Sequence, residues 1–267
     1  MKNKRVDFFV LLMAAAAWAA AGCQVAERDE GNGDRQEAGV RNLEVALAAQ
    51  QEEETRTGVS AYPNVSRQQT VAIDGTFAEW AQVSPDFQHY RGNTMHRSHL
   101  GHTNGNLAYF NTTGRNDIVD AKVTRDADYV YFYVETAASI TAYTDPQWMR
   151  LLINKDMNWS TGWKGYDYCL NFETPASATQ GYISQCSGTS WSWTRQGTYD
   201  YRVTGNKMEL RIPRSLFPSG KLDFAFKWAD NNLYDTVPTG RETHILNLYV
   251  DGDAAPGGRF NFHYVEP

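Results

Sequence analysis

The sequence of 267 residues has few cysteines, no excess of basic residues and almost no long hydrophobic run. Three cysteines are too few for a scaffold held mainly by disulfides. The 25 Lys+Arg and 31 Asp+Glu give a net charge of −6, which argues against a nucleic-acid-binding protein, since that class needs basic residues to replace phosphate counterions. Aromatic residues, in contrast, make up 13% of the chain, more than packing alone requires.

The sequence also lacks common catalytic motifs: it has no Gly-x-Ser-x-Gly elbow, no Gly-rich phosphate loop and no Cys-x-x-Cys. His96, His99 and His102 have the residue type for a zinc site, but the Gly, Asn and Ser around them predict a loop with solvated histidines. The sequence thus contains no diagnostic motif of an enzyme, although a polysaccharide-degrading enzyme, either a lyase or a metal hydrolase, remains an alternative.

The longest apolar run covers residues 8–21 and follows three basic residues, which is typical of a secretory signal peptide. Residues 20–23 (AAGC) resemble a bacterial lipobox, which implies cleavage at residue 22 and lipidation of Cys23. Gln24 in the next position then predicts sorting to the outer membrane, facing the periplasm or the cell surface. A plain secretory signal with an incidental cysteine is the alternative.

Residues 23–57 follow this signal and lack aromatic side chains altogether. Nine acids and four bases between residues 24 and 57 predict a solvated acidic tether. Of the 35 aromatic residues, 3 lie in the signal, so the other 32 all belong to residues 58–267. One folded domain is expected to begin near Gly58.

Cys169 and Cys186 are the remaining cysteines, and a disulfide between them suits an exported protein. Residues 166–172 and 181–186 read as two strands around a turn at 174–179. A hairpin centred near residue 177.5 would place the two cysteines opposite each other, within disulfide reach. Two buried thiols are the alternative.

Alternation of apolar and polar residues with period two recurs along the domain, for example at residues 129–134, 207–212 and 222–228. Turn residues separate these segments, and no long amphipathic helix stands out. The pattern predicts an all-β fold, in the form of a two-sheet antiparallel β-sandwich of the jelly-roll kind.

Several motifs, in order, resemble family 9 carbohydrate-binding modules and the related DOMON-like sandwiches. They are residues 73–80 (IDGTFAEW), 128–134 (DYVYFYV), 151–156 (LLINKD) with 161–167, 224–231 (FAFKWADN) and the closing residues 252–261. The resemblance implies a non-catalytic glycan-binding sandwich with structural calcium. It does not carry over the pair of tryptophans that grips a sugar end in that family, because no Trp follows Trp228. DOMON relatives also leave haem binding as an alternative, with Met149, Met157 or Met208 and a histidine as ligands.

The loop at residues 156–167 contains oxygen-bearing side chains that suit calcium, namely Asp156, Asn158 and Asp167. The alternative is a set of Asx turns in which these side chains bond the loop's own backbone.

Four tryptophans are the candidate ligand-binding residues. Trp159 and Trp163 belong to this loop, and Trp191 and Trp193 lie two apart on one face of a strand. An indole ring can stack on the apolar C–H face of a sugar, although Trp163, Trp191 and Trp193 also suit the core. Trp80 and Trp228 are assigned to the core. The sequence therefore predicts a lipoprotein that binds a polysaccharide or oligosaccharide, with polysaccharide-degrading enzymes or a transporter as partners and no nucleic acid. A purely structural surface domain is a further alternative.

Overall fold

The computed structural model describes residues 68–94, 97–100, 108–111, 113–232, 252–258 and 260–266. These residues belong to the second of two compact units into which the chain divides, Val59–Pro267. The predicted lipidation residue Cys23, the signal peptide, the tether and the histidines at 96 and 102 lie outside the described residues.

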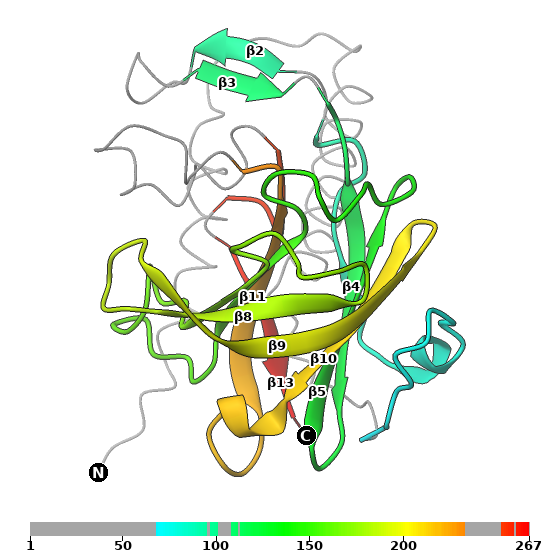
Figure 1. The fold of residues 1–267 in the computed structure, drawn as a ribbon, viewed down its shortest axis with the longest axis vertical. Helices are drawn as coiled ribbons and strands as arrows, with labels where there is room; N and C mark the ends of the chain where they lie inside the picture. Colours follow the sequence, from blue (N-terminus) through cyan, green and yellow to red (C-terminus); the bar gives the residue numbers. More distant parts are fainter. Residues whose placement is uncertain are drawn as a thin grey trace, which may run out of the picture. The chain divides into compact units, whose positions relative to one another are not determined.

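Strands dominate the described part of the chain (Figure 1). In chain order they are β1 (Phe87–Gln88), β2 (Arg97–Leu100), β3 (Ala108–Asn111), β4 (Ile118–Arg125), β5 (Tyr129–Thr136), β6 (Arg150–Asn154), β7 (Tyr168–Leu170), β8 (Gln180–Cys186), β9 (Trp193–Thr204), β10 (Lys207–Pro213), β11 (Asp223–Asp230), β12 (Asp253–Ala255) and β13 (Phe262–Val265). Helix is limited, among these residues, to the short 3₁₀ turns η1 (Glu79–Gln82) and η2 (Arg214–Leu216). The predicted all-β class is confirmed.

Backbone pairing joins eleven of these strands into one antiparallel sheet, in the order β1-β4-β5-β10-β9-β8-β7-β6-β11-β12, with β13 also paired to β11. The hairpin of β2 and β3 is separate from it. The predicted two-sheet sandwich is not confirmed, because the main strands form a continuous sheet rather than two sheets packed face to face. Figure 1 shows β8 and β9 crossing in front of β11.

The sheet curls around one main core. Phe132 on β5 packs against Phe224 and Phe226 on β11, with ring centroids 5.8 and 5.7 Å apart, although five strands separate β5 from β11 in the sheet order. These inward side chains alternate with outward ones, as the period-two pattern predicts. Trp228 is part of this core, as expected, and is fully buried.

The two ends of the curled sheet meet through side chains. Phe87 on β1 contacts Phe226 on β11 and Phe262 on β13, at 5.1 and 5.3 Å between ring centroids. At the start of β4 the amide of Ile118 donates to Asp253 Oδ2 at 2.8 Å, and at the end of β4 Arg125 forms an ion pair with Glu266. The core is thereby closed where backbone pairing stops.

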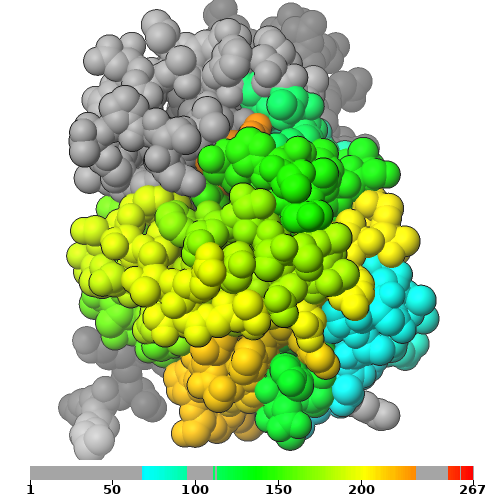
Figure 2. Space-filling model, in the orientation of Figure 1, coloured from blue at the N-terminus to red at the C-terminus, as the bar shows by residue number. Residues whose placement is uncertain are grey.

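The outer face of the sheet is also covered, at β5, by the segment that precedes β1. Residues before β1 lie against β5, where Trp80 packs at 5.4 Å from Tyr133 and is 2% exposed. Figure 2 shows this N-terminal segment, in cyan, beside the yellow residues near the β9–β10 turn. There the Thr204 hydroxyl donates to the Gly75 carbonyl at 3.0 Å.

A buried carboxylate holds that covering segment. Glu209, fully buried on β10, accepts hydrogen bonds from the amides of Asp74 and Gly75 at 3.0 and 2.8 Å and from Trp80 Nε1 at 2.9 Å. The carboxylate thereby satisfies one buried donor, Trp80 Nε1, and two partly buried backbone amides. The IDG motif at residues 73–75 is therefore a docking point on β10.

We expect Glu209→Ala to lower the free energy of unfolding by about 3 kcal/mol, because the buried Trp80 Nε1 and two partly buried backbone amides lose their acceptor. Glu209→Gln should cost less, since the amide oxygen can keep the two backbone donors. Urea unfolding measures both. Lys221→Ala, at an exposed turn, is the control and should change stability by less than about 0.5 kcal/mol. Equal stability of Glu209→Ala and this control would refute the role of Glu209.

Asp120 provides a pH-dependent prediction. It stands opposite Glu135 in the β4–β5 pairing, and burial together with the neighbouring Asp86 carboxylate raises the pKa of Asp120 to about 7. A raised folded-state pKa gives stability that is fully present below the unfolded value near 4 and is lost as pH rises through 7. Asp120→Asn should therefore be about 1–2 kcal/mol more stable than wild type at pH 8, after allowance for solvent screening, and similar at pH 4.

Urea unfolding at the two pH values checks this prediction. Asp128→Asn, on an exposed turn, should shift the unfolding free energy by less than about 0.5 kcal/mol at either pH. An Asp120→Asn variant that is less stable than wild type at pH 8 would contradict the expected destabilisation by the ionised Asp120 carboxylate.

Candidate functional site

The loop between β6 and β7 folds back on the outer face of the sheet. Trp163 and Tyr166 exchange backbone hydrogen bonds at 3.0 and 2.9 Å around a two-residue turn formed by Lys164 and Gly165. Both turn residues have positive φ, 52° and 94°, as this kind of hairpin turn requires. The amide of Asp167 then donates to the Ile153 carbonyl at 2.8 Å, which leads the chain into β7.

The three predicted calcium ligands bond the loop's own backbone. Asp156 Oδ1 accepts from the amide of Asn158, and Asn158 Oδ1 accepts from the amide of Ser160, both at 3.0 Å. Asp167 Oδ2 accepts from the amide of Lys155 at 3.0 Å, and burial raises the pKa of Asp167. Asp156 and Asn158 each close an Asx turn, as the alternative expects, whereas Asp167 ties the end of the loop back to its start at Lys155. Calcium binding by the loop stays a prediction.

The structure brings three of the four predicted tryptophans together. Trp163 is 1% exposed, and its ring centroid lies 4.5 Å from that of Trp191, which in turn lies 5.3 Å from Trp193. We call their surroundings the outer aromatic cluster. Its members are Leu152, Trp163, Tyr166, Cys169, Ala229 and Ala254, with the partly buried Phe172, Cys186, Trp191 and Trp193. Ser192 and Thr194 are exposed, whereas Trp191 and Trp193 are half-buried and pack against Phe172; ligand binding by these two tryptophans stays a prediction.

Trp159 is the exception, with 48% of its surface exposed. Its indole lies against the backbone of Gly165: a Cβ added there would come within 2.4 Å of Trp159 Cε3. A glycine is required for this approach as well as for the positive φ of the turn. Trp159 is thus an exposed ring held in place from one side, next to Asn154 of β6.

The predicted disulfide between Cys169 and Cys186 is wrong in this structure, where both residues are reduced thiols. The β7–β8 pairing sets Tyr168 opposite Gln185, so the hairpin is centred at (168 + 185)/2 = 176.5 and Cys169 faces Ser184. Cys186 is therefore a diagonal neighbour, at a separation of roughly 7–8 Å that exceeds disulfide reach. Both thiols remain on the outer face, in the outer aromatic cluster.

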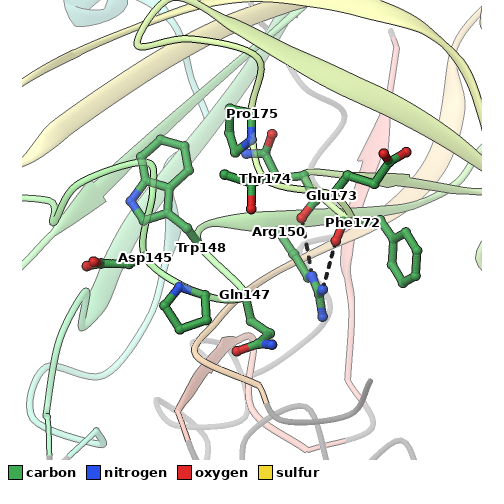
Figure 3. Close-up of a pocket in the computed structure, with 10 residues that line it drawn as sticks. Asp145, Gln147, Trp148, Arg150, Phe172, Glu173, Thr174 and Pro175 are labelled. Carbon is green, nitrogen blue, oxygen red and sulfur yellow. Dashed lines mark hydrogen bonds between the residues drawn. The ribbon is translucent and has the colours of Figure 1, made fainter. Parts of the chain in front are cut away.

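A pocket of about 260 Å³ adjoins this cluster (Figure 3). It is lined by Asp145, Pro146, Gln147, Trp148, Arg150, Asn171, Phe172, Glu173, Thr174 and Pro175. The carboxylates of Asp145 and Glu173 point away from its middle in Figure 3, toward ion pairs with Arg115 and Arg195. The volume is slightly below that of typical drug-sized ligand sites, about 300–1,000 Å³.

Arg150 connects the pocket to the outer aromatic cluster. Its guanidinium is buried and donates to the carbonyls of Asn171 and Phe172, at 3.3 and 3.0 Å, and to Asn232 Oδ1 at 3.2 Å. The guanidinium carbon also lies 5.4 Å from the Phe172 ring and 5.9 Å from the Trp191 ring. Because protein acceptors engage these N–H groups, Arg150 positions the wall rather than offering a free anion site.

Strained backbone concentrates around this pocket. Gln147, Met149 and Asn171 have φ of 51°, 38° and 57°, which non-glycine residues adopt rarely and at a cost. The amide of Met149 donates to the buried Asp230 carboxylate at 2.9 Å, and its carbonyl accepts from Asn171 Nδ2 at 3.1 Å. These bonds hold the wall in one conformation.

None of the residues that line the pocket is among the candidate site residues predicted from the sequence. The pocket combines residues 145–150 with residues 171–175, which become neighbours through the β6–β7 pairing. No motif spans the two segments, so nothing in the sequence marked them as one site.

His89 and Arg91 have side chains of the types that a lyase could use, and Met149 and Met208 are two of the candidate haem ligands. His89 is half-buried, and burial lowers its pKa, while Arg91 donates to the Ala137 carbonyl. Met149 and Met208 are fully buried in the main core. Within the described ranges no group of three His, Cys, Asp or Glu side chains is arranged to hold a metal ion.

Comparison with known proteins identifies no relative: no family model, no curated protein and no solved structure matches the chain. No helix in the described part of the chain has the length and apolar character needed to cross a membrane. The site must therefore be interpreted from its own geometry.

Gly165→Ala should displace the Trp159 ring, because the new methyl would overlap it. Gly220, with the same φ of 94° and nothing within 4 Å of an added Cβ, provides a matched control. Gly220→Ala should cost only the backbone strain, about 1–2 kcal/mol. Gly165→Ala should cost more and should also change tryptophan fluorescence of the folded protein. Identical stability and spectra for the two variants would show that Trp159 does not pack on Gly165.

Proposed function

We propose that residues 58–267 form a non-catalytic domain that binds a polysaccharide or oligosaccharide through exposed aromatic side chains. Trp159 is the observation that carries the proposal, as an indole 48% exposed and supported on one side by Gly165. A ring held in this way can stack on the apolar C–H face of a pyranose and loses little side-chain freedom on binding.

Polar groups around Trp159 suit the hydroxyls of the same ligand. Asp156, Asn158, Ser160 and Thr161 are exposed. Their bonds within the loop orient them, as with the Thr161 hydroxyl, which donates to the Asn158 carbonyl at 3.1 Å. A carboxylate or carbonyl oxygen that accepts one hydrogen bond still has a lone pair for a second donor. An aromatic platform with such neighbours favours a sugar over a purely apolar ligand.

The proposal includes display of this domain at the cell envelope. A lipid on Cys23 would anchor the chain in the outer membrane, and residues 24–57 would serve as the tether. A flexible segment of 34 residues spans roughly 30 Å root-mean-square. Many anchored copies would strengthen weak single-site binding and hold a glycan near degrading enzymes or a transporter.

A glycan array with purified residues 58–267 tests the proposal. We expect Trp159→Ala to weaken binding about 10-fold or more, because the stacking surface is removed, and Trp159→Phe to weaken it less. Tyr90→Ala, an aromatic residue 69% exposed on another loop, is the control and should bind like wild type. Repeating the array with EDTA tests the calcium prediction.

Wild-type protein that binds no glycan, or a Trp159→Ala variant that binds as well as wild type, would overturn the proposed function. New reducing or unsaturated ends during the incubation would instead support an enzyme. Urea unfolding of each variant verifies that the fold is retained.

A further inference from the structure

Phe260 is the most exposed large hydrophobic residue of the described part of the chain, at 75%. It lies in the connection between β12 and β13, next to Asn261. The following residues turn inward, where Phe262 packs on Phe87 and Phe226 of the main core. Exposure of this ring is therefore not a consequence of a loosely attached strand.

The connection that carries Phe260 is fastened on both sides. Lys227, fully buried on the outer face of β11, donates to the carbonyl of Pro256. On the other side Asn261 Oδ1 accepts a hydrogen bond from the Tyr166 hydroxyl at 2.5 Å. The backbone at residue 260 is thus held between two anchored residues of the same short connection.

The bond between Tyr166 and Asn261 also links Phe260 to the Trp159 loop. Tyr166 is fully buried and stacks on Trp163 at 6.1 Å and 25°. It directly follows Gly165, the residue that supports the Trp159 ring. One tyrosine side chain and one hydrogen bond therefore separate the segments of the two exposed rings, and both segments cover the same outer face of β6 and β11.

A glycan chain fits this arrangement better than a protein partner does. The contact that connects the two segments is polar, a hydrogen bond from the buried Tyr166 hydroxyl to the partly exposed Asn261 side chain, and not an apolar packing contact. Successive sugar units offer apolar faces to aromatic rings and hydroxyls to amides along one chain. A protein interface of useful size would instead require a contiguous, well-packed patch.

We propose that Trp159 and Phe260 are two stacking positions of one surface, which binds an internal stretch of a linear oligosaccharide long enough to contact both rings. The inference rests on the proposed carbohydrate-binding function and adds Phe260 as a binding residue. It makes an extended chain, rather than a single sugar, the ligand of this face.

Isothermal titration of the purified full chain with length series of one to six sugar units tests the inference. The probes are β-1,4-linked glucose, xylose and mannose oligomers, together with the length series of any glycan bound on the array. Affinity should rise with length up to the oligomer that spans both rings. Phe260→Ala should weaken the long oligomers about 5- to 10-fold and leave the shortest bound oligomer unchanged, while Phe260→Tyr should keep most of the gain.

Trp159→Ala should weaken oligomers of every length, and the double variant should bind long and short oligomers alike. Binding that needs Trp159 but does not depend on Phe260 or on chain length would overturn this inference and leave the proposed function standing. If the protein binds none of the series, both this inference and the proposed function are refuted. Tyr90→Ala should retain the length dependence of wild type.

Discussion

Burial of β6 and β11 on both of their faces determines how the rest of the domain is built. All five residues of β6 are buried, and so are seven of the eight residues of β11. One face is covered by curling of the sheet, which brings Phe132 to Phe224 and Phe226. The other face needs a second cover, and the loops at 155–167 and 187–193 provide it with tryptophans. Trp163, Tyr166, Phe172, Trp191 and Trp193 belong to this second cover, which accounts for part of the aromatic excess of the sequence.

Buried polar groups fix those covering segments, because loops contribute few backbone bonds to the sheet. Glu209 binds the segment before β1, Asp230 binds the wall of the pocket, and Lys227 binds the connection before β13. Each is fully buried, and each satisfies backbone groups of a segment distant in sequence. Burial raises the pKa of Asp230 and lowers that of Lys227 to about 7, which shows the cost of placing charge there. A buried polar group that lacks some of its hydrogen bonds destabilises the folded state, so these bonds favour one arrangement of the loops.

The all-β class and the core positions of Trp80 and Trp228 could be predicted from alternation and motif order. Curling into one sheet could not, since period-two patterns are the same for one curled sheet and two packed sheets. The disulfide prediction failed for a related reason. A shift of the hairpin centre from 177.5 to 176.5 moves the partner of Cys169 by two residues, and the Thr and Ser residues of the turn do not specify its length. The pocket escaped prediction because its two segments are joined only by strand pairing.

Trp159 and Trp163 show how far residue type alone can define a ligand site. Both lie in one loop, only four residues apart, yet one is 48% exposed and the other 1%. The turn at Lys164 and Gly165 makes the difference, because it reverses the chain and directs Trp163 into the outer aromatic cluster. Gly165 then has no side chain to fill the space that the Trp159 ring occupies. Packing of Trp163 thus creates the support on which Trp159 stays exposed, so the structural and the candidate ligand-binding tryptophans depend on one another.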